Sequence, residues 1–207
     1  VVLRELCQLY KVFITTEIPE DYYRCQLESF TYRNQVVDVG CVQANFVDVD
    51  RARSFENLGK FFADNLTRVG QEREWLAQNK IDLVITDVAS TPLVSASELE
   101  LPSMVIGNFN WHDIYSHFPE AGDHPDLIDQ LENQYRCANV QVLPQIHLKT
   151  TAVSKLEEIG LLSLPGEDIR DDILQVLPPE MKHRPWVFIY LGQYDSSEVE
   201  WKRLSEM

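Results

Sequence analysis

Two short apolar runs separated by a helix-length segment constrain the fold of this chain more than any other feature. Residues 83–86 read Leu-Val-Ile-Thr, residues 104–107 read Met-Val-Ile-Gly, and a polar cluster follows each run. Residues 91–99 between them have helical character. A strand, a helix and a second strand in this order are typical of a parallel sheet covered by helices. The sequence therefore predicts an α/β fold.

Further segments extend this pattern in both directions. A helical stripe over residues 2–10 leads directly into an apolar run at 12–15, which is the order found in the second half of a β-α-β unit. We therefore expect a first strand and its loop to be missing, and the chain to be a fragment or a degenerate relative. The other predicted elements are a helix at 21–28, extended chain or strands over 31–42, a long helix at 51–78 capped by Asp50, a helical turn or short helix at 111–118, a helix at 126–137 and a strand at 140–143.

The pattern predicts a Rossmann-like parallel sheet flanked by helices, followed by the start of a second Rossmann-like domain. Residues 1–150 form the first domain in this prediction, residues 151–184 connect the domains, and residues 185–207 begin the second. Prolines interrupt the connecting segment, in which 155–161 and 168–177 are predicted as short helices.

Composition excludes some classes of function. The 207 residues carry 18 basic and 33 acidic side chains, a net charge of −15 without a basic cluster, which argues against nucleic acid as a partner. No apolar run approaches the roughly 20 residues that span a bilayer. The four cysteines are widely spaced, and we interpret them as reduced thiols of a cytoplasmic protein.

Polar side chains follow the two central runs, at the sheet edge where ligands of parallel α/β proteins bind. Asp87 is a candidate base or hydrogen-bond acceptor, with helix capping as the alternative, and Trp111 is either a surface for a sugar ring or a packed anchor. His112 is a candidate general acid or base, with an ordinary surface histidine as the alternative. The remaining candidates for substrate binding are Ser90, Thr91, Asn108, Asn110 and Asp113, of which the first two can equally be helix caps.

Other chemistries have little support. His112, His117 and His124 do not share a helix face, and no zinc motif, nucleophile elbow, Walker loop or GxGxxG is present. We therefore predict no metal and no cofactor. Gly192, Gln193 and Tyr194 follow a predicted strand at 186–191 and precede a predicted helix, a loop type that can contact a phosphate.

Several segments, taken in order, resemble bacterial glycosyltransferase-like proteins of GT-B architecture, related to the amino-terminal domain of plant arabinokinases. The segment 38–43, Asp-Val-Gly-Cys-Val-Gln, resembles the family's DVGVVQ-like motif, and the strand and aspartate-containing loop at 83–92 also match. The segment 106–115 resembles its NFxWxxIY motif, and the last strand with Gly192 resembles the glycine-rich loop of the second domain. The family's glycine- and histidine-rich first loop is absent, its second glycine is Gln193 here, and most of the carboxyl-terminal domain is missing.

The resemblance implies a metal-independent glycosyltransferase, present here as a fragment, that transfers a sugar from a nucleotide-sugar donor to an unknown acceptor. The alternative is a non-catalytic sugar- or nucleotide-binding module, or an assembly module, derived from that fold. The absent loop favours this alternative for the chain itself. A sheet that lacks a central strand also invites a partner strand, so a homo-oligomer is possible.

Overall fold

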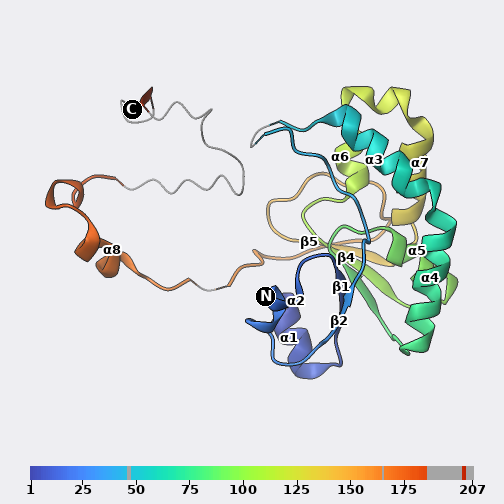
Figure 1. Cartoon of the computed structure of the whole chain (residues 1–207), viewed down its shortest axis with the longest axis horizontal. Coiled ribbons are helices and arrows are strands. Elements are labelled where there is room, and N and C mark those ends of the chain that lie inside the picture. Colours follow the sequence, from blue (N-terminus) through green and yellow to red (C-terminus); the bar gives the residue numbers. More distant parts are fainter. Residues whose placement is uncertain (46–47, 165, 186–201, 204–207) are drawn as a thin grey trace. The chain divides into compact units, whose positions relative to one another are not determined.

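A computed structural model describes residues 1–45, 48–164, 166–185 and 202–203, in which helices and strands alternate along the chain (Figure 1). The helices are α1 (Val2–Leu9), α2 (Glu20–Arg24), α3 (Arg51–Ala63), α4 (Asn65–Gln78), α5 (Thr91–Glu98), α6 (Trp111–Tyr115), α7 (Pro125–Tyr135) and α8 (Arg170–Val176), with 3-10 turns at Pro119–Asp123 and Pro179–Met181. The strands are β1 (Phe13–Thr16), β2 (Thr31–Asn34), β3 (Val84–Thr86), β4 (Ser103–Ile106), β5 (Val140–Leu143) and β6 (Leu156–Glu158).

The chain divides into two units. The first comprises Val1–Val42 and Asp50–Leu162 and contains the six strands that the described residues form. The second comprises Gln43–Val49 and Ser163–Met207, and its described residues include α8 and an antiparallel bridge between Gln43 and Val49. The predicted strand at 186–191 and the Gly192–Tyr194 loop lie outside the described residues, and the domain limits at 150 and 184 stay predictions.

All strand pairs of the first unit are parallel. β1 pairs with β2, and a second sheet has the order β3-β4-β5-β6. Helices α3, α4, α5 and α7 gather along one side of the strands (Figure 1). The chain is therefore an α/β protein with Rossmann-like parallel sheets flanked by helices, as the sequence predicted.

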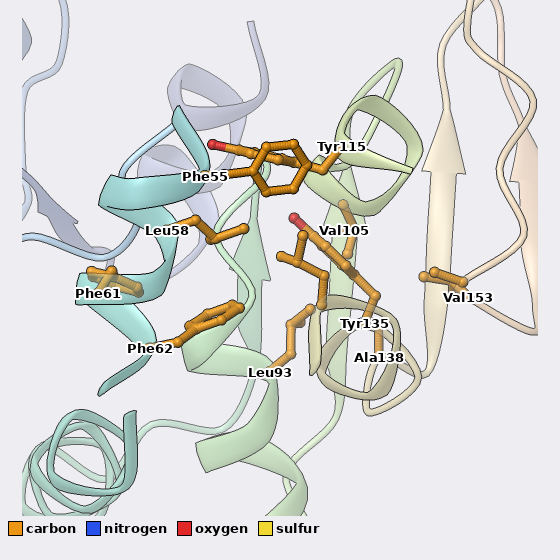
Figure 2. Close-up of a cluster of buried hydrophobic side chains, with 12 residues drawn as sticks. Phe55, Leu58, Phe61, Phe62, Leu93, Val105, Tyr115, Tyr135, Ala138 and Val153 are labelled. Atoms are coloured by element: carbon orange, nitrogen blue, oxygen red, sulfur yellow. The ribbon is translucent and has the colours of Figure 1, made fainter. Parts of the chain in front are cut away.

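The main core lies between α3, α5, α6, α7 and the strand β4. Phe55 of α3 meets Tyr115 of α6 edge to face, with ring centroids 5.1 Å apart (Figure 2). Leu93 and Val105 are fully buried beneath them. The burial of such side chains stabilises the fold by about 1.5–3 kcal/mol each. This core holds α6, and with it the segment that follows β4, in a defined position.

The predicted long helix at 51–78 is two helices. Asp50 caps α3 as predicted, accepting a hydrogen bond of 3.0 Å from the amide of Arg53. The helix ends at Ala63, Asp64 leaves helical geometry, and α4 starts at Asn65. As a result, Leu66 is 89% exposed, although it continues the helical spacing of Phe55, Leu58 and Phe62 in the sequence.

The prediction of a helix at 155–161 is wrong. Residues 156–158 form β6, whose three side chains are exposed and which pairs with β5 at the edge of the sheet. Parallel pairing with β5 stabilises this strand more than the weak helical pattern of the sequence stabilises a helix. The predicted helix at 21–28 was too long, since α2 ends at Arg24, and residues 31–34 of the segment predicted as strands or extended chain form β2.

The described residues contain neither a membrane-spanning helix nor a cluster of metal-ligating side chains. No helix there combines the length and apolar character that crossing a bilayer requires. Nor do histidine, cysteine and carboxylate side chains of the described part of the chain gather in threes around a point that could hold a metal ion. Cys7, Cys25, Cys41 and Cys137 are free thiols.

Candidate functional site

The ends of the two sheets meet on one side of the first unit. Asp38 lies four residues after β2, and its carboxylate is close enough to those of Asp87, after β3, and Glu17, after β1, for their charges to raise its pKa. Trp111, at the start of α6, contacts the same group through its indole N–H. We call Asp38, Asp87 and Trp111 the strand-end cluster.

The Asp38 carboxyl of this cluster has a raised pKa. Its burial is the main cause of a raised pKa, and the charges of Asp87 and Glu17 raise it further. The indole N–H of Trp111 and the amide of Gly40 act in the opposite direction, because they stabilise the carboxylate. The indole N–H is buried without reaching the geometry of a full hydrogen bond, so it retains donor capacity.

Asp87 sits against the loop that follows β4. A Cβ built on Gly107 would lie 3.0 Å from the carbonyl oxygen of Asp87 and 3.1 Å from its Oδ1, so the strand-end loops approach closely only because residue 107 is glycine. The Asp87 side chain keeps contact with solvent, yet the surrounding protein desolvates it enough to raise its pKa. A carboxyl in this position can accept hydrogen bonds from a ligand.

Trp111 is half-buried between two chain segments. Its ring lies over Gly40, whose positive φ of 54° suits glycine and whose Cβ position would be 3.2 Å from the indole. The ring also meets Phe109 edge to face at 5.4 Å. The residues 38–40 and 111 are thus held together, which joins the two motifs on which the family resemblance rests.

Asn110 and Asp113 hold α6 in place. The Asn110 side chain accepts from the Asp113 amide at 2.9 Å, and the Asp113 carboxylate accepts from the Asn110 amide at 3.1 Å, which is a capping box. The Asn110 amide group also donates to Thr150 at 2.8 Å and Gln141 at 3.1 Å. Because Asn110 is fully buried, its structural bonds leave it no surface for a ligand.

Ser90 and Thr91 are buried as well. The Ser90 hydroxyl donates to Gln134 at 2.5 Å, and Gln134 in turn donates to Asn65 at 3.0 Å, so Ser90 links α5 to α7 and α4. The Thr91 hydroxyl is buried without a hydrogen-bond partner. Neither hydroxyl belongs to the strand-end cluster, whereas the exposed Asn108 side chain, two residues before Asn110, is accessible.

His112 faces Asp113 rather than Asp87. Its Nδ1 is 4.0 Å from Asp113 Oδ1, and this nitrogen is buried without a hydrogen bond. The residue itself is only 9% exposed. Among the described residues, no hydrogen bond or ion pair joins the His112 side chain to Asp38 or Asp87, so its predicted role as acid or base has no geometric support.

Two residues of the site were not anticipated as functional. In the sequence, Asp38 stands out only as part of the family-like motif at 38–43, and Tyr135 only as one residue of the predicted helix at 126–137. The Tyr135 hydroxyl donates to the carbonyl of Val88 and accepts from the Trp111 amide at 3.0 Å, so it ties the β3 loop to the β4 loop. Burial raises its pKa, with contributions from the charges of Asp38, Asp113 and Asp87. A buried tyrosine near the end of a helix gives no signal of this role in the sequence.

The strand ends are not the only polar surface. An open groove of about 400 Å³ runs between α4, α5 and α7 and is lined by helix-surface amides and carboxylates, including Asn65, Asp126 and Asn133. It contains no aromatic ring and none of the residues that the sequence singled out. The strand-end cluster, where both family-like motifs meet, is therefore the better candidate.

Fold and site define the chain as a Rossmann-like parallel α/β protein with carboxylates and a tryptophan at its strand ends. Among curated proteins it is similar to L-arabinokinase of Arabidopsis thaliana, with 27% identity over 131 residues. The match covers 61% of this chain and 13% of the relative, so the chain spans a small part of that protein. No protein-family model matches the chain, and neither does any solved structure.

Proposed function

We propose that the chain is the sugar-binding part of a glycosyltransferase-like protein of GT-B type and that the strand-end cluster binds the sugar. The observation that carries this proposal is the convergence of the Asp38 and Asp87 carboxyls with the Trp111 ring at the ends of parallel strands. Carboxylates accept hydrogen bonds from hydroxyls, and an indole ring packs on the apolar face of a sugar. The similarity to a protein named L-arabinokinase supports a sugar as the ligand.

The charge of the cluster favours the neutral part of a ligand. Glu17 and Asp87 place two further carboxyls within electrostatic reach of Asp38. A phosphate at this point would meet repulsion, whereas hydroxyls would find acceptors. We therefore assign the sugar ring, rather than the diphosphate of a nucleotide-sugar donor, to the strand ends, and the predicted phosphate contact of Gly192, Gln193 and Tyr194 to the second domain.

The second candidate is a binding module without catalysis, and one observation favours it. His112, the predicted acid or base, is buried beside Asp113, and no hydrogen bond or ion pair within the described residues joins its side chain to the carboxyls of Asp38 or Asp87. In that case the chain would bind a sugar through Asp38, Asp87 and Trp111 but would not transfer it.

A titration of the 207-residue chain tests sugar binding. The ligands are L-arabinose, other free pentoses and hexoses, and UDP-sugars, and binding is followed by calorimetry and by tryptophan fluorescence. Loss of a hydrogen bond to a charged group costs about 1.5–3 kcal/mol, so we expect Asp87→Asn and Asp38→Asn to weaken binding about 10-fold or more. Trp111→Ala should weaken binding and reduce the change in fluorescence.

Asp82→Asn is the matched control, because Asp82 is an exposed aspartate next to the opposite end of β3. Its affinity should equal that of the unaltered chain. Absence of binding to every sugar, or equal weakening by the variants at positions 82 and 87, would contradict the proposal. An assay for UDP release, with a UDP-sugar and acceptors present, distinguishes the two candidate functions. A transferase would release UDP, whereas a binding module would bind the UDP-sugar without releasing UDP.

A further inference from the structure

A groove follows the helix α7 along its whole length, beside α5. Its first part is the groove of about 400 Å³ described above, and its second part, of about 280 Å³, is lined by Ser97, Glu100, Leu101, Pro102, Cys137 and Asn139. Cys137 lines both parts and therefore joins them. We call the two parts together the α5–α7 groove. No residue of the strand-end cluster lines it, so it is a separate surface.

One face of α7 forms a wall of this groove. The lining residues recur at intervals of three and four positions, which places them on the same side of a helix. They are Asp126, Asp129, Gln130, Asn133, Gln134 and Cys137. From α5, Val94 and Ser97 have the same spacing and line the first and the second part. The groove is thus a continuous feature of two packed helices rather than a local depression.

Hydrogen bonds hold the walls in position. The Asn139 side chain accepts from the Ser103 amide at 2.7 Å, which fixes the segment after α7 against the start of β4. At the other end, Gln134 is bonded to both Ser90 and Asn65, as described above. These bonds fix the groove in the chain alone, so a partner meets a formed surface.

The groove is negatively charged. The described residues that line it include no lysine, arginine or histidine, and its carboxylates are Asp126, Asp129 and Glu100. Within the described part of the chain, none of these three forms an ion pair. Two glutamates of the same helices that do not line the groove are paired, Glu98 with Arg73 at 3.0 Å and Glu132 with Arg136 at 2.6 Å. The groove carboxylates are therefore available to a cation from outside.

Two helix ends add to this charge. α5 ends at Glu98 and α7 at Tyr135, and the second part of the groove lies directly beyond both ends. The carboxyl end of a helix carries a partial negative charge, which a cation in the last turn usually balances. Neither helix has a basic residue in its last turn. A positively charged side chain at this point would meet two helix ends and Glu100.

Glu100 occupies a backbone position that favours glycine. Its φ of 56° lies in the left-handed region, two residues after the end of α5, where glycine is the usual residue. Glutamate is less stable than glycine in this conformation. The carboxylate of Glu100 can therefore be removed by a substitution that stabilises the fold.

We propose that the α5–α7 groove binds a basic segment of another protein, whose arginine or lysine side chains lie between the two helices. The 11 residues of α7 rise about 16 Å, which an extended segment of about five residues covers. A single exposed ion pair contributes little, so the partner needs several cations in this short length. A second copy of this chain fits poorly, because it has a net charge of −15 and no basic cluster.

Protection of Cys137 from alkylation tests the place of binding. The probe is a fluorescent eight-residue peptide in which arginines and alanines alternate, and the rate of modification by iodoacetamide is followed at each cysteine by mass spectrometry. A saturating peptide should slow alkylation of Cys137 at least 5-fold. Cys25, an exposed thiol after α2, is the internal control and should react at an unchanged rate. A peptide with glutamine in place of arginine should protect neither thiol.

Paired substitutions test the role of the carboxylates, with the affinity of the peptide measured by fluorescence anisotropy. Glu100→Gly with Asp129→Asn should weaken binding about 5-fold or more, since it removes two of the three groove charges. The matched control is Glu28→Gln with Asp82→Asn, which changes the net charge equally at exposed residues outside the groove, and it should weaken binding less than 2-fold. Glu100→Gly alone should weaken binding while it raises the melting temperature, so its effect is distinct from unfolding.

The opposite results would overturn the proposal. Equal weakening by the two paired variants would mean that the peptide responds only to the net charge of the chain. Unchanged alkylation of Cys137 would place the peptide elsewhere. Protection by spermine equal to that by the peptide would show that small cations, rather than a protein segment, occupy the groove. Protection without peptide that grows with protein concentration would identify a second copy as the occupant.

Discussion

Asn108 and Asn110 are two asparagines of one loop with opposite environments. Asn110 is fully buried, caps α6 and donates to Thr150 and Gln141, whereas the Asn108 side chain is exposed. Asn110→Ala should therefore lower the free energy of unfolding by about 2–4 kcal/mol, from a lost cap and buried partners left unpaired. Asn108→Ala should lower it by less than about 0.5 kcal/mol, as surface substitutions do.

Urea denaturation of the two variants measures both values. A loss of sugar affinity without a loss of stability in Asn110→Ala would show that its role is binding rather than support of the loop. Asn108→Ala, conversely, should reduce affinity only if its exposed amide reaches the ligand.

The raised pKa of Asp38 makes a prediction about pH. Burial and the nearby charge of Asp87 raise the pKa of this carboxyl above its ordinary 3.8 in the folded chain. The folded state then holds a proton that the unfolded state releases, so this group's contribution to stability falls as the pH rises from about 3.8 through the raised pKa. Asp38→Asn should therefore increase the free energy of unfolding at pH 8, and the increase should shrink toward pH 4.

Denaturation midpoints measured at intervals between pH 4 and pH 8 check this dependence. Asp82→Asn, which alters an exposed aspartate, is the reference for a general change in net charge. A gain that is constant across the range would mean that the ionisation of Asp38 does not contribute to it.

At the scale of elements, the break between α3 and α4 determines which leucines are buried and contribute to the free energy of unfolding. Leu58 is 4% exposed in the main core, whereas Leu66 is 89% exposed although it fits the same helical period. Leu58→Ala should lower the free energy of unfolding by about 2–5 kcal/mol, the usual range for a buried leucine. Leu66→Ala should change it by less than about 0.5 kcal/mol. Chemical denaturation gives both numbers, and equal losses would mean that one continuous helix buries both residues.

The sequence predicted most of the elements because their signals are local. Asp50 caps α3, and the apolar runs at 84–86, 103–106 and 140–143 are parallel strands, as their patterns indicated. The break at Asp64 was missed because nothing in the helical period interrupts it. β6 was missed because its pairing with β5 is a tertiary effect that overrode local propensity.

The candidate site was harder to predict than the fold. The sequence placed Asp87 and Trp111 at strand ends, but the role of Asp38 depends on a contact across some 70 residues with Trp111. Burial also distinguishes candidate residues that support the loops from candidates that a ligand can reach. Burial depends on packing in the folded chain rather than on residue type. It assigns Asn110 and Ser90 to the support of the loops and leaves Asp87 accessible.

At the scale of the whole first unit, Trp75 is the side chain that connects the two sheets. It contacts Phe13 of β1, lies under the Arg33 guanidinium and packs with the cluster around Val84. Trp75→Ala should lower the free energy of unfolding by about 2–4 kcal/mol, since the residue is partly rather than fully buried. It should also increase exchange at β1 and β2 more than at β4 and β5.

Trp75→Phe is the matched variant, because phenylalanine keeps a ring against Phe13 but fills less space. It should lose less than half as much stability. Uniform loss of protection in every strand would show that the two sheets unfold as one unit without a weak junction at Trp75.

The outer strand β6 determines in which direction such a sheet can grow. Its three side chains are exposed, and two of them are the glutamates Glu157 and Glu158. A second copy that approached this edge would place like charges opposite each other, and charged edge residues are a common protection against aggregation. Addition of further strands at this edge, and with it end-to-end polymerisation through β6, is thereby disfavoured.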